Sequence, residues 1–255
     1  MNAARRQRIG AAFGRAADYD RAALVQARIA AALAARIAAL PLPPAPRVLE
    51  IGCGTGFLTE ALIAQGLGGA WLVSDLSPAM AARARARVGE APGRRFAVLD
   101  GEHGARPEGG PFDLVCSSLT FQWFDDLGAG AARLMDWLAP GGWLAFTTLC
   151  AGTFAEWRSA HAAVGAEAGT LPFPSLARLG AVFPEAEVTA ELEVEQHGDA
   201  RAFLRGIKAI GAGTPAPGHR PLPPRRLAAV MHAFEDAGAR ASYEVATVMW
   251  QKPRS

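Results

Sequence analysis

This sequence of 255 residues has few cysteines and no excess of charge of either sign. Its three cysteines, Cys53, Cys116 and Cys150, are an odd set without C-x-x-C spacing, which argues against a disulfide framework and a zinc site. Its 26 basic and 24 acidic residues leave a formal charge of +2, too balanced for a general nucleic-acid binder. We therefore expect buried free thiols, no metal ion and no nucleic-acid partner.

Long apolar runs are missing as well. The longest apolar helical stretch, Ile29 to Leu40, is interrupted by Arg36 and is shorter than the ~20 residues that a bilayer span needs. Residues 1–17 carry four arginines and no acid, as transit peptides do, but no secretory-type apolar core follows before Asp18. We expect no membrane anchor and a cytoplasmic protein.

The residues that are present indicate a folded protein with unevenly distributed charge. Apolar residues make up 51% of the chain and charged residues 20%, which excludes disorder as the main state. Residues 1–50 carry a net charge of +5, residues 51–200 a net charge of −9 and residues 201–255 a net charge of +6. If both basic ends fold onto one face, that face attracts an acidic partner.

From residue 45 onward, short apolar runs alternate with longer amphipathic segments. This rhythm is typical of a parallel sheet with helices on both faces. The expected strands are Arg47–Ile51, Ala70–Ser74, Phe96–Leu99, Phe112–Ser117, Trp143–Leu149, Glu187–His197 and Tyr243–Gln251. The expected helices are Asp18–Leu40, Thr55–Gln65, Pro78–Val88, Gly128–Leu138, two short ones within residues 153–183, Asp199–Ile210 and Arg225–Asp236.

Breaks in this pattern predict how one domain is organised. Residues 1–44 are expected to form a helical lid, residues 45–150 a ligand-binding core, and residues 199–240 a helical insertion before the last strand. Pro140-Gly141-Gly142 is expected to be a turn that leads into the next strand. Tyr19 and Gln26 are seven residues apart, or two helical turns, so both would face the ligand from the lid.

A glycine-rich loop, Gly52-Cys53-Gly54-Thr55-Gly56, follows the first strand and opens a helix. A dinucleotide fingerprint would need its third glycine at position 57, which is Phe57 here. The pattern suits a nucleoside without a pyrophosphate, and Glu50, two residues before the loop, can pair with an ammonium group. S-adenosylmethionine (AdoMet) has both features, whereas an ordinary glycine turn is the alternative.

Polar residues follow the next three strands and complete the predicted cofactor site. Asp75 ends the second strand, where a carboxylate accepts hydrogen bonds from ribose hydroxyls, although it could instead cap the next helix. Asp100 would face the adenine edge or remain solvated, and the serines after the fourth strand would face the reactive end or cap a turn. The predicted cofactor contacts are Glu50, Gly52, Cys53, Gly54, Gly56, Asp75, Leu76, Asp100, Gly101, Ser117 and Ser118.

Residues 47–149, with these motifs, resemble the class I AdoMet-dependent methyltransferases. The resemblance implies a three-layer α/β/α Rossmann-like fold with a seven-stranded, mostly parallel sheet in the order 3-2-1-4-5-7-6. It makes Tyr243–Gln251 the antiparallel seventh strand and Glu187–His197 the sixth. A helical cap completes the expected fold.

Three further stretches resemble the malonyl-acyl-carrier-protein O-methyltransferases of biotin synthesis. They are residues 13–26, residues 118–124, and residues 203–212 with the pattern L-R-x-I-K-x-x-G-A. The resemblance implies methylation of the free carboxyl group of a malonyl thioester on acyl carrier protein. The implied substrate contacts are Tyr19, Gln26, Gln122, Trp123, Arg205 and Lys208. Ser117-Ser118 departs from the Ser-Asn that the family often has there.

The chemistry of this reaction agrees with the lack of an obvious acid–base pair. A carboxylate attacks a sulfonium methyl group without a general base, so no catalytic residue is assigned. Arg205 and Lys208, three residues apart on one helix, would hold a malonyl carboxylate or carrier phosphates, or be solvated cations. Trp123 and Phe121 would wall a dry pocket or belong to the core, and all five histidines are interpreted as structural or surface residues.

Three alternatives remain open at this point. The thioester carrier can be coenzyme A in place of a protein, so malonyl-coenzyme A is a second possible partner. The methyl acceptor can also be a small soluble acid or a quinone-type ring. The third alternative is a non-catalytic AdoMet-binding protein, but the intact Glu50, Gly52, Gly54 and Asp75 argue against it.

Overall fold

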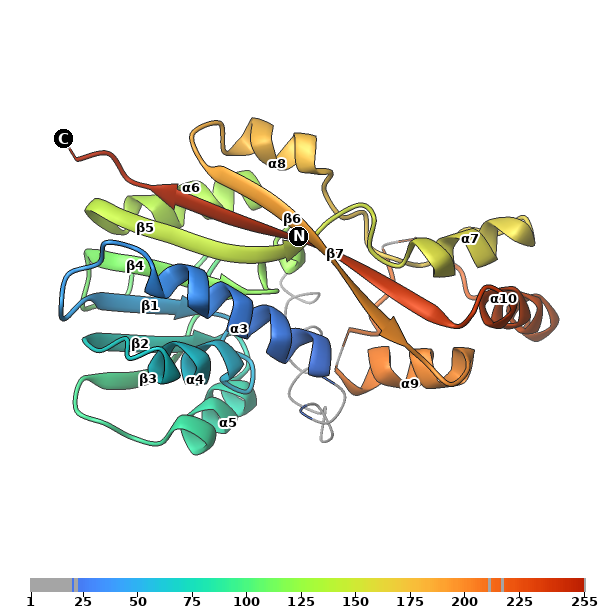
Figure 1. Cartoon of the computed structure of the whole chain (residues 1–255), viewed down its shortest axis with the longest axis horizontal. Coiled ribbons are helices and arrows are strands. Elements are labelled where there is room, and N and C mark those ends of the chain that lie inside the picture. Colours follow the sequence, from blue (N-terminus) through green and yellow to red (C-terminus); the bar gives the residue numbers. More distant parts are fainter. Residues whose placement is uncertain (1–19, 21–22, 211, 217, 255) are drawn as a thin grey trace.

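The computed structural model describes residues 20, 23–210, 212–216 and 218–254 (Figure 1). A seven-stranded sheet in the order β3-β2-β1-β4-β5-β7-β6 forms its centre. The strands from β3 to β5 pair in parallel, whereas β7 is antiparallel to both β5 and β6. The predicted fold class and strand order are confirmed.

The strands and helices follow the predicted alternation along the chain. The strands are β1 (Arg47–Ile51), β2 (Ala70–Asp75), β3 (Arg94–Val98), β4 (Phe112–Ser118), β5 (Leu138–Leu149), β6 (Glu187–Gln196) and β7 (Arg240–Gln251). The helices are α3 (Leu24–Ala38), α4 (Phe57–Ala64), α5 (Pro78–Val88), α6 (Leu127–Asp136), α7 (Ala155–Ala163), α8 (Leu176–Val182), α9 (Ala200–Ala209) and α10 (Pro224–Asp236), with a short 3-10 turn η1 (Phe121–Trp123).

The predicted turn at Pro140-Gly141-Gly142 is wrong, because these residues lie inside β5. Phe112 of β4 pairs with Leu138, but Leu114 pairs with Trp143, so β5 contains an irregularity where the expected turn would be. Gly141 has a φ of +77°, and a Cβ at Gly142 would lie 2.9 Å from the carbonyl oxygen of Phe112. The glycines therefore kink a continuous strand rather than end a loop.

Apolar side chains cover both faces of the sheet, as a parallel sheet requires. On one face, Leu33 and Ile37 of α3 pack with Leu58 and Leu62 of α4 over Val48 of β1. On the other face, a second cluster gathers around α6, α8 and β5 and contains, among others, Leu134, Phe146, Leu179 and Phe183. These two clusters hold the carboxyl ends of the parallel strands in fixed positions.

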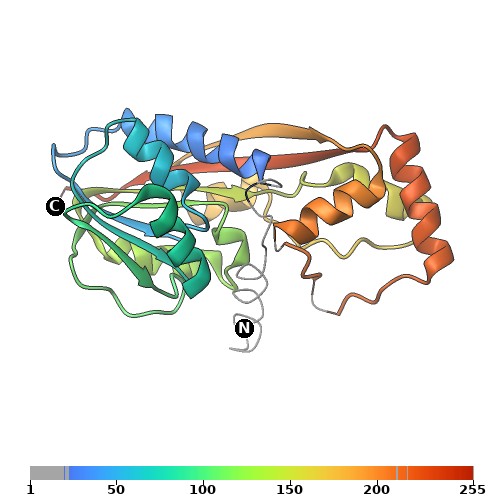
Figure 2. The same ribbon diagram turned by 90° about the horizontal axis from the view of Figure 1, so that it is seen from below.

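Strands β6 and β7 run past the rest of the sheet and carry a separate group of helices (Figures 1 and 2). We call α7, α9, α10 and these strand ends the helical lobe. Trp157, Phe203, Val230 and Phe234 are members of its apolar core. The predicted insertion contains α9 and α10, but α7 precedes β6 and packs against α10. The sequence pattern did not indicate that α7 belongs to this lobe.

Helix α3 is part of the layer that covers the sheet. It packs against α4, β4 and β5, and two of its arginines bind the edge strand β6. Arg28 donates two hydrogen bonds to Glu193, at 3.0 and 2.9 Å, and Arg36 lies 2.6 Å from Glu187. These two basic side chains thus tie α3 to the edge of the sheet, although the side chain of Arg28 remains 51% exposed. Residues 1–19, 21 and 22 of the predicted lid, Tyr19 among them, lie outside the described residues.

None of the helices in the described part of the chain is both long enough and apolar enough to cross a membrane.

Candidate functional site

A cavity of about 890 Å³ lies between the carboxyl ends of the parallel strands and the helical lobe. Its size is near the upper end for small-molecule pockets, so it offers room for a cofactor and a substrate group together. Glu50, Gly52, Cys53 and Gly54 line it from the glycine loop. Helices α7 and α9 line it from the opposite side.

The glycine loop has a backbone that side chains would not tolerate. Gly52 has a φ of +67°, and a Cβ there would lie 2.2 Å from the Oγ1 atom of Thr120. Thr120 donates a hydrogen bond to the carbonyl oxygen of Gly52 at 3.1 Å, so it braces the loop from the segment after β4. Gly56 lies against Ala84 of α5, outside the cavity lining, and its predicted cofactor contact becomes a packing role.

Glu50 is a buried carboxylate at the end of β1. Its side chain is part of the cavity wall although the residue is only 1% exposed, and Thr59 donates a hydrogen bond to its Oε2 atom at 2.6 Å. Loss of hydration on burial raises the pKa of Glu50 from 4.5 to about 7. A cationic ligand group beside this carboxylate would favour its charged form.

Asp75 joins the end of β2 to the glycine loop. Its Oδ2 atom accepts a hydrogen bond from the backbone N–H of Gly54 at 2.9 Å, and its Oδ1 atom accepts one from Ser77 at 2.7 Å. Burial raises its pKa, and these two hydrogen bonds act in the opposite direction. The N–H of Ser77 belongs to the residue just before α5, so Asp75 does not cap the N–H groups of the first turn of that helix. Asp75 and the next residue, Leu76, both line the cavity.

The segment after β3 lies beside Asp75 along the same edge. Asp100 accepts hydrogen bonds from the backbone N–H groups of Glu102 and His103, both at 3.0 Å, and it lines the cavity. A Cβ on Gly101 would lie 2.3 Å from the side chain of Ile51, so only glycine fits next to β1.

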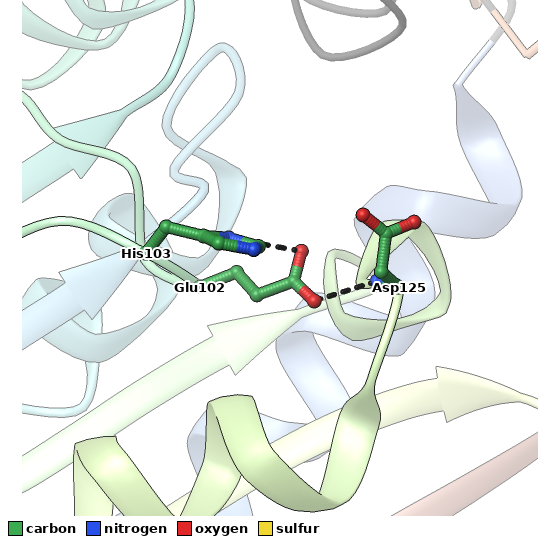
Figure 3. A group of neighbouring side chains, drawn as sticks. All are labelled: Glu102, His103 and Asp125. Atoms are coloured by element: carbon green, nitrogen blue, oxygen red, sulfur yellow. Dashed lines mark hydrogen bonds and ion pairs between the residues drawn. The ribbon is translucent and has the colours of Figure 1, made fainter. Parts of the chain in front are cut away.

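Glu102, His103 and Asp125 form a cluster of possible metal ligands next to the cavity (Figure 3). The Oε1 atom of Glu102 accepts hydrogen bonds from the backbone of Asp125 at 2.7 Å and of Asp126 at 2.9 Å. His103 lies 3.5 Å from the other carboxylate oxygen of Glu102. These contacts explain the cluster as a brace for the start of α6, and we assign it no metal.

The two serines after β4 have different surroundings. Ser117 is fully buried, does not line the cavity, and donates a hydrogen bond to the carbonyl oxygen of Ile51 at 2.8 Å. Its predicted cofactor contact is therefore corrected to a link between β1 and β4, because its side chain points into the packed sheet. Ser118 does line the cavity, with its hydroxyl 3.3 Å from that of Thr147.

Two glutamines reach the cavity with an unused acceptor each. The Oε1 atoms of Gln26 on α3 and Gln122 on η1 are buried and have no hydrogen-bond partner among the described residues. Gln122 uses its Nε2 atom to donate to the carbonyl oxygen of Leu119 at 2.7 Å. Buried acceptors are ordinarily satisfied, so these two oxygens indicate a ligand with hydrogen-bond donors.

The two aromatic residues next to Gln122 in the sequence differ in their surroundings. Trp123 lines the cavity, as the pocket hypothesis requires. Phe121 is 1% exposed and stacks on Phe124 and Phe146, so it belongs to the core.

The two cations of α9 do not act as one clamp. Lys208 lines the cavity, but Arg205 does not. The side chain of Arg205 is 69% exposed and lies 3.9 Å from Asp199, the residue that caps α9. Both residues are exposed to solvent, and they differ in that only Lys208 also borders the cavity.

Sequence reasoning missed His161 as a cavity residue, because a lone histidine without metal spacing carries no signal by itself. His161 on α7, interpreted above as a structural or surface residue, is 4% exposed and lines the cavity, as does His219. Tyr243 was also missed; it lines the cavity and donates a hydrogen bond from its hydroxyl to Glu195 at 3.1 Å. Both were hidden because the long strands bring α7 and β7 to a site far away in sequence.

Charge is separated across the cavity. The carboxylates that line it, Glu50, Asp75, Asp100 and Glu102, all belong to the strand side. On the lobe side, Lys208 is the one residue with a permanent charge among the described lining residues. The strand side therefore suits a cation with hydroxyl groups, and the lobe side suits an anion or a neutral chain.

Comparisons with known proteins agree with this geometry. A family profile described as "Methyltransferase domain" matches residues 49–144. The chain is 44% identical over 222 residues to a malonyl-acyl-carrier-protein O-methyltransferase of Magnetococcus marinus, covering 86% of this chain and 82% of that protein. It is also 48% identical over 244 residues to the biotin biosynthesis bifunctional protein BioCD of Bordetella avium. That match covers 95% of this chain but only 52% of the length of BioCD.

The fold has relatives among solved structures too. The YcgJ protein of Bacillus subtilis matches with a TM-score of 0.59 at 14% identity, covering 88% of this chain and 98% of that one. An identity this low supports the fold alone. From its sequence relatives, the chain belongs to the AdoMet-dependent malonyl-acyl-carrier-protein O-methyltransferase family.

Proposed function

We propose that this protein transfers the methyl group of AdoMet to the free carboxyl group of a malonyl thioester on acyl carrier protein. The products are the malonyl methyl ester and S-adenosylhomocysteine. The observation that carries this proposal is the charge separation of the cavity, with four carboxylates on the strand side and Lys208 on the lobe side. A cationic cofactor and an anionic substrate would meet between them.

On the strand side, each part of AdoMet would meet a group of suitable chemistry. Glu50 is a buried carboxylate that a ligand ammonium group can pair with, and the unused acceptors of Gln26 and Gln122 suit the same donor. Asp75, which lines the cavity next to Leu76, would accept hydrogen bonds from the ribose hydroxyls. Asp100 and Gly101, farther along the same edge, would face the adenine.

On the lobe side, the substrate carboxylate would be held by Lys208. AdoMet supplies an electrophilic methyl group, and a carboxylate attacks it without losing a proton, so the protein needs no general base. The apolar side chains of Phe203, Leu204 and Ile207 lie next to Lys208 on the cavity wall. They would exclude water from the carboxylate and strengthen its attraction to the lysine.

The N-terminal residues would close the cofactor side. Gln26 on α3 lines the cavity, but α3 itself packs over the sheet, so the proposed lid is limited to the residues before α3. The three cysteines are buried and free, which fits the reducing conditions of the cytoplasm.

An AdoMet consumption assay tests the proposal. The purified protein is offered malonyl-acyl carrier protein, malonyl-coenzyme A and free malonate at equal concentrations. We expect kcat/KM to be highest for the carrier-bound thioester, and the product ester to be seen by mass spectrometry. Preference for free malonate would contradict the proposal and indicate a methyltransferase for small soluble acids. Preference for malonyl-coenzyme A would show that coenzyme A, and not acyl carrier protein, carries the malonyl group.

A further inference from the structure

The lobe side of the cavity contains a buried histidine whose second ring nitrogen is unused. His161 on α7 is 4% exposed, and its Nδ1 atom lies 2.9 Å from the carbonyl oxygen of Trp157, one turn earlier. A carbonyl oxygen only accepts hydrogen bonds, so Nδ1 must carry the proton. Nε2, at the other end of the ring, makes no hydrogen bond to a described residue, while the side chain lines the cavity.

The ring is held rigidly in this orientation. Trp157 contacts it edge-on with ring centroids 4.8 Å apart, and Trp157 is itself packed against Phe203 and Phe234 of the lobe core. The position of Nε2 is therefore set by α7 and the lobe core.

His161 is neutral in this environment. Burial lowers its pKa, the hydrogen bond to Trp157 acts in the opposite direction, and the nearby His219 lowers the pKa further. A neutral ring with a proton on Nδ1 presents a lone pair at Nε2. Such a group accepts a hydrogen bond from an N–H donor and does not attract a carboxylate.

We propose that the Nε2 atom of His161 binds an amide N–H of the flexible thiol arm that carries the malonyl group. This inference rests on the proposed function, because it assumes a thioester substrate. Acyl groups on carrier proteins and on coenzyme A are attached through an arm that contains amide groups, and each amide needs an acceptor for its N–H when it leaves water.

The surroundings of His161 fit such an arm. Lys208 lies on the same side of the cavity and would hold the charged end of the malonyl group. The lobe side of the cavity wall is largely apolar, with Phe154 and Phe173 among its residues, and it also contains His219 and Tyr243. A largely apolar wall with a buried acceptor suits a neutral chain with an amide. A malonate ion without an arm would leave Nε2 unpaired, so His161 would favour thioesters over free acids.

The test compares two substrates on three variants. The substrates are malonyl-pantetheine, whose arm contains amides, and the malonyl thioester of butanethiol, which has none. The variants are His161→Phe, which removes the acceptor, His161→Gln, which retains one, and the control His232→Phe on the exposed face of α10. AdoMet affinity and the melting temperature are measured for each.

We expect His161→Phe to lower kcat/KM for malonyl-pantetheine about tenfold and to change the value for the butanethiol ester less than twofold. His161→Gln should stay within about threefold of the wild type on both substrates, and His232→Phe should behave as the wild type. AdoMet affinity should not change. The Gln variant keeps the test valid if the Phe variant fails to fold.

Equal losses on both substrates would overturn the inference and make His161 a structural residue. It would also be overturned if His161→Phe retained full activity on malonyl-pantetheine, or if the Gln variant lost as much as the Phe variant. A wild-type protein that methylates neither thioester but does methylate free malonate would instead contradict the proposed function.

Discussion

Thr59 donates its hydroxyl hydrogen to Glu50 at 2.6 Å, and this is the one side-chain hydrogen bond to that carboxylate among the described residues. Thr59 is uncharged, so it relieves only part of the cost of burying an acid. The remaining cost makes the charge of Glu50 depend on what binds in the cavity, and two predictions depend on this pair.

AdoMet affinity should rise with pH below neutrality. In the free protein the pKa of Glu50 is about 7, so near pH 5.5 most of this carboxyl is protonated and cannot pair with the AdoMet ammonium group. Binding then releases a proton, and the affinity should increase about tenfold between pH 5.5 and 7. Calorimetry in two buffers with different ionisation enthalpies measures the proton release. Glu50→Gln should bind weakly with no such pH dependence, and a pH-independent wild type would contradict the assignment.

The same carboxylate should destabilise the ligand-free protein above neutral pH. Its pKa is higher in the folded state than in the unfolded state, so the folded protein binds more protons and its stability falls as pH rises from about 4.5 to about 7. Glu50→Gln should therefore raise the free energy of unfolding at pH 8 by about 2–3 kcal/mol, as measured by denaturant titration. Thr59 is left unchanged in both proteins, so that they differ only at position 50. Equal free energies of unfolding at pH 8 would argue against the raised pKa of Glu50.

Replacing Asp75 should weaken the cofactor site and loosen the glycine loop. Asp75→Ala removes the acceptor for the backbone N–H groups of Gly54 and Ser77, as well as the proposed ribose contacts. We expect AdoMet binding to weaken by about 2–4 kcal/mol in calorimetry, as for charge-assisted hydrogen bonds. Asp75→Asn keeps an acceptor oxygen and should lose less. Wild-type affinity in the alanine variant would reject the ribose role.

The contact between Gly52 and Thr120 can be tested by a double-mutant cycle. Gly52→Ala forces an alanine into positive φ and places its Cβ 2.2 Å from the Thr120 hydroxyl oxygen, so we expect about 2–4 kcal/mol of destabilisation. Adding Thr120→Ala should restore part of this loss, because it removes the two nearest atoms. Gly180→Ala in α8, where a Cβ meets nothing within 4 Å, is the matched control and should not destabilise. If the changes in unfolding free energy of the two single variants simply add in the double variant, the added Cβ does not clash with the Thr120 side chain.

Charge reversal should separate the two cations of α9. Lys208→Glu should lower kcat/KM at least tenfold for malonyl-acyl carrier protein and for small malonyl thioesters alike, because Lys208 lines the cavity. Lys208 is also exposed to solvent, so part of this loss should shrink as salt is added. Arg205→Glu should affect only the carrier-bound substrate, by less, and the effect should shrink as salt is added, because its side chain is 69% exposed. Steady-state kinetics at 20 and 500 mM salt distinguishes them. Identical behaviour of both variants would contradict the placement of Lys208.

The alternation of strands and helices and the positive-φ glycines of the loop were predictable from the sequence because their signals are local, whereas the order of the strands came from the resemblance to a known family. Glycines of the loop mark positions with positive φ, and Glu50 and Asp75 stand at the ends of apolar runs whose carboxyl ends must share one edge of a parallel sheet. The boundaries of β1 and α5 were predicted to the residue, since β1 lies between Pro46 and Gly52 and α5 begins after the Ser77-Pro78 helix start signal. Such features are set by neighbours within a few residues.

The other half of the cavity was decided by tertiary structure. Whether Ser117 or Ser118 reaches the cavity depends on which face of β4 each one occupies within the packed sheet, and this placed Ser117 against Ile51. Of the two cations on α9, only Lys208 borders the cavity. His161 lies at the cavity because β6 and β7 extend past the sheet and carry α7 and α9 there. Contacts between segments so far apart in the chain leave no periodic trace in the sequence, because they depend on the length and direction of whole strands.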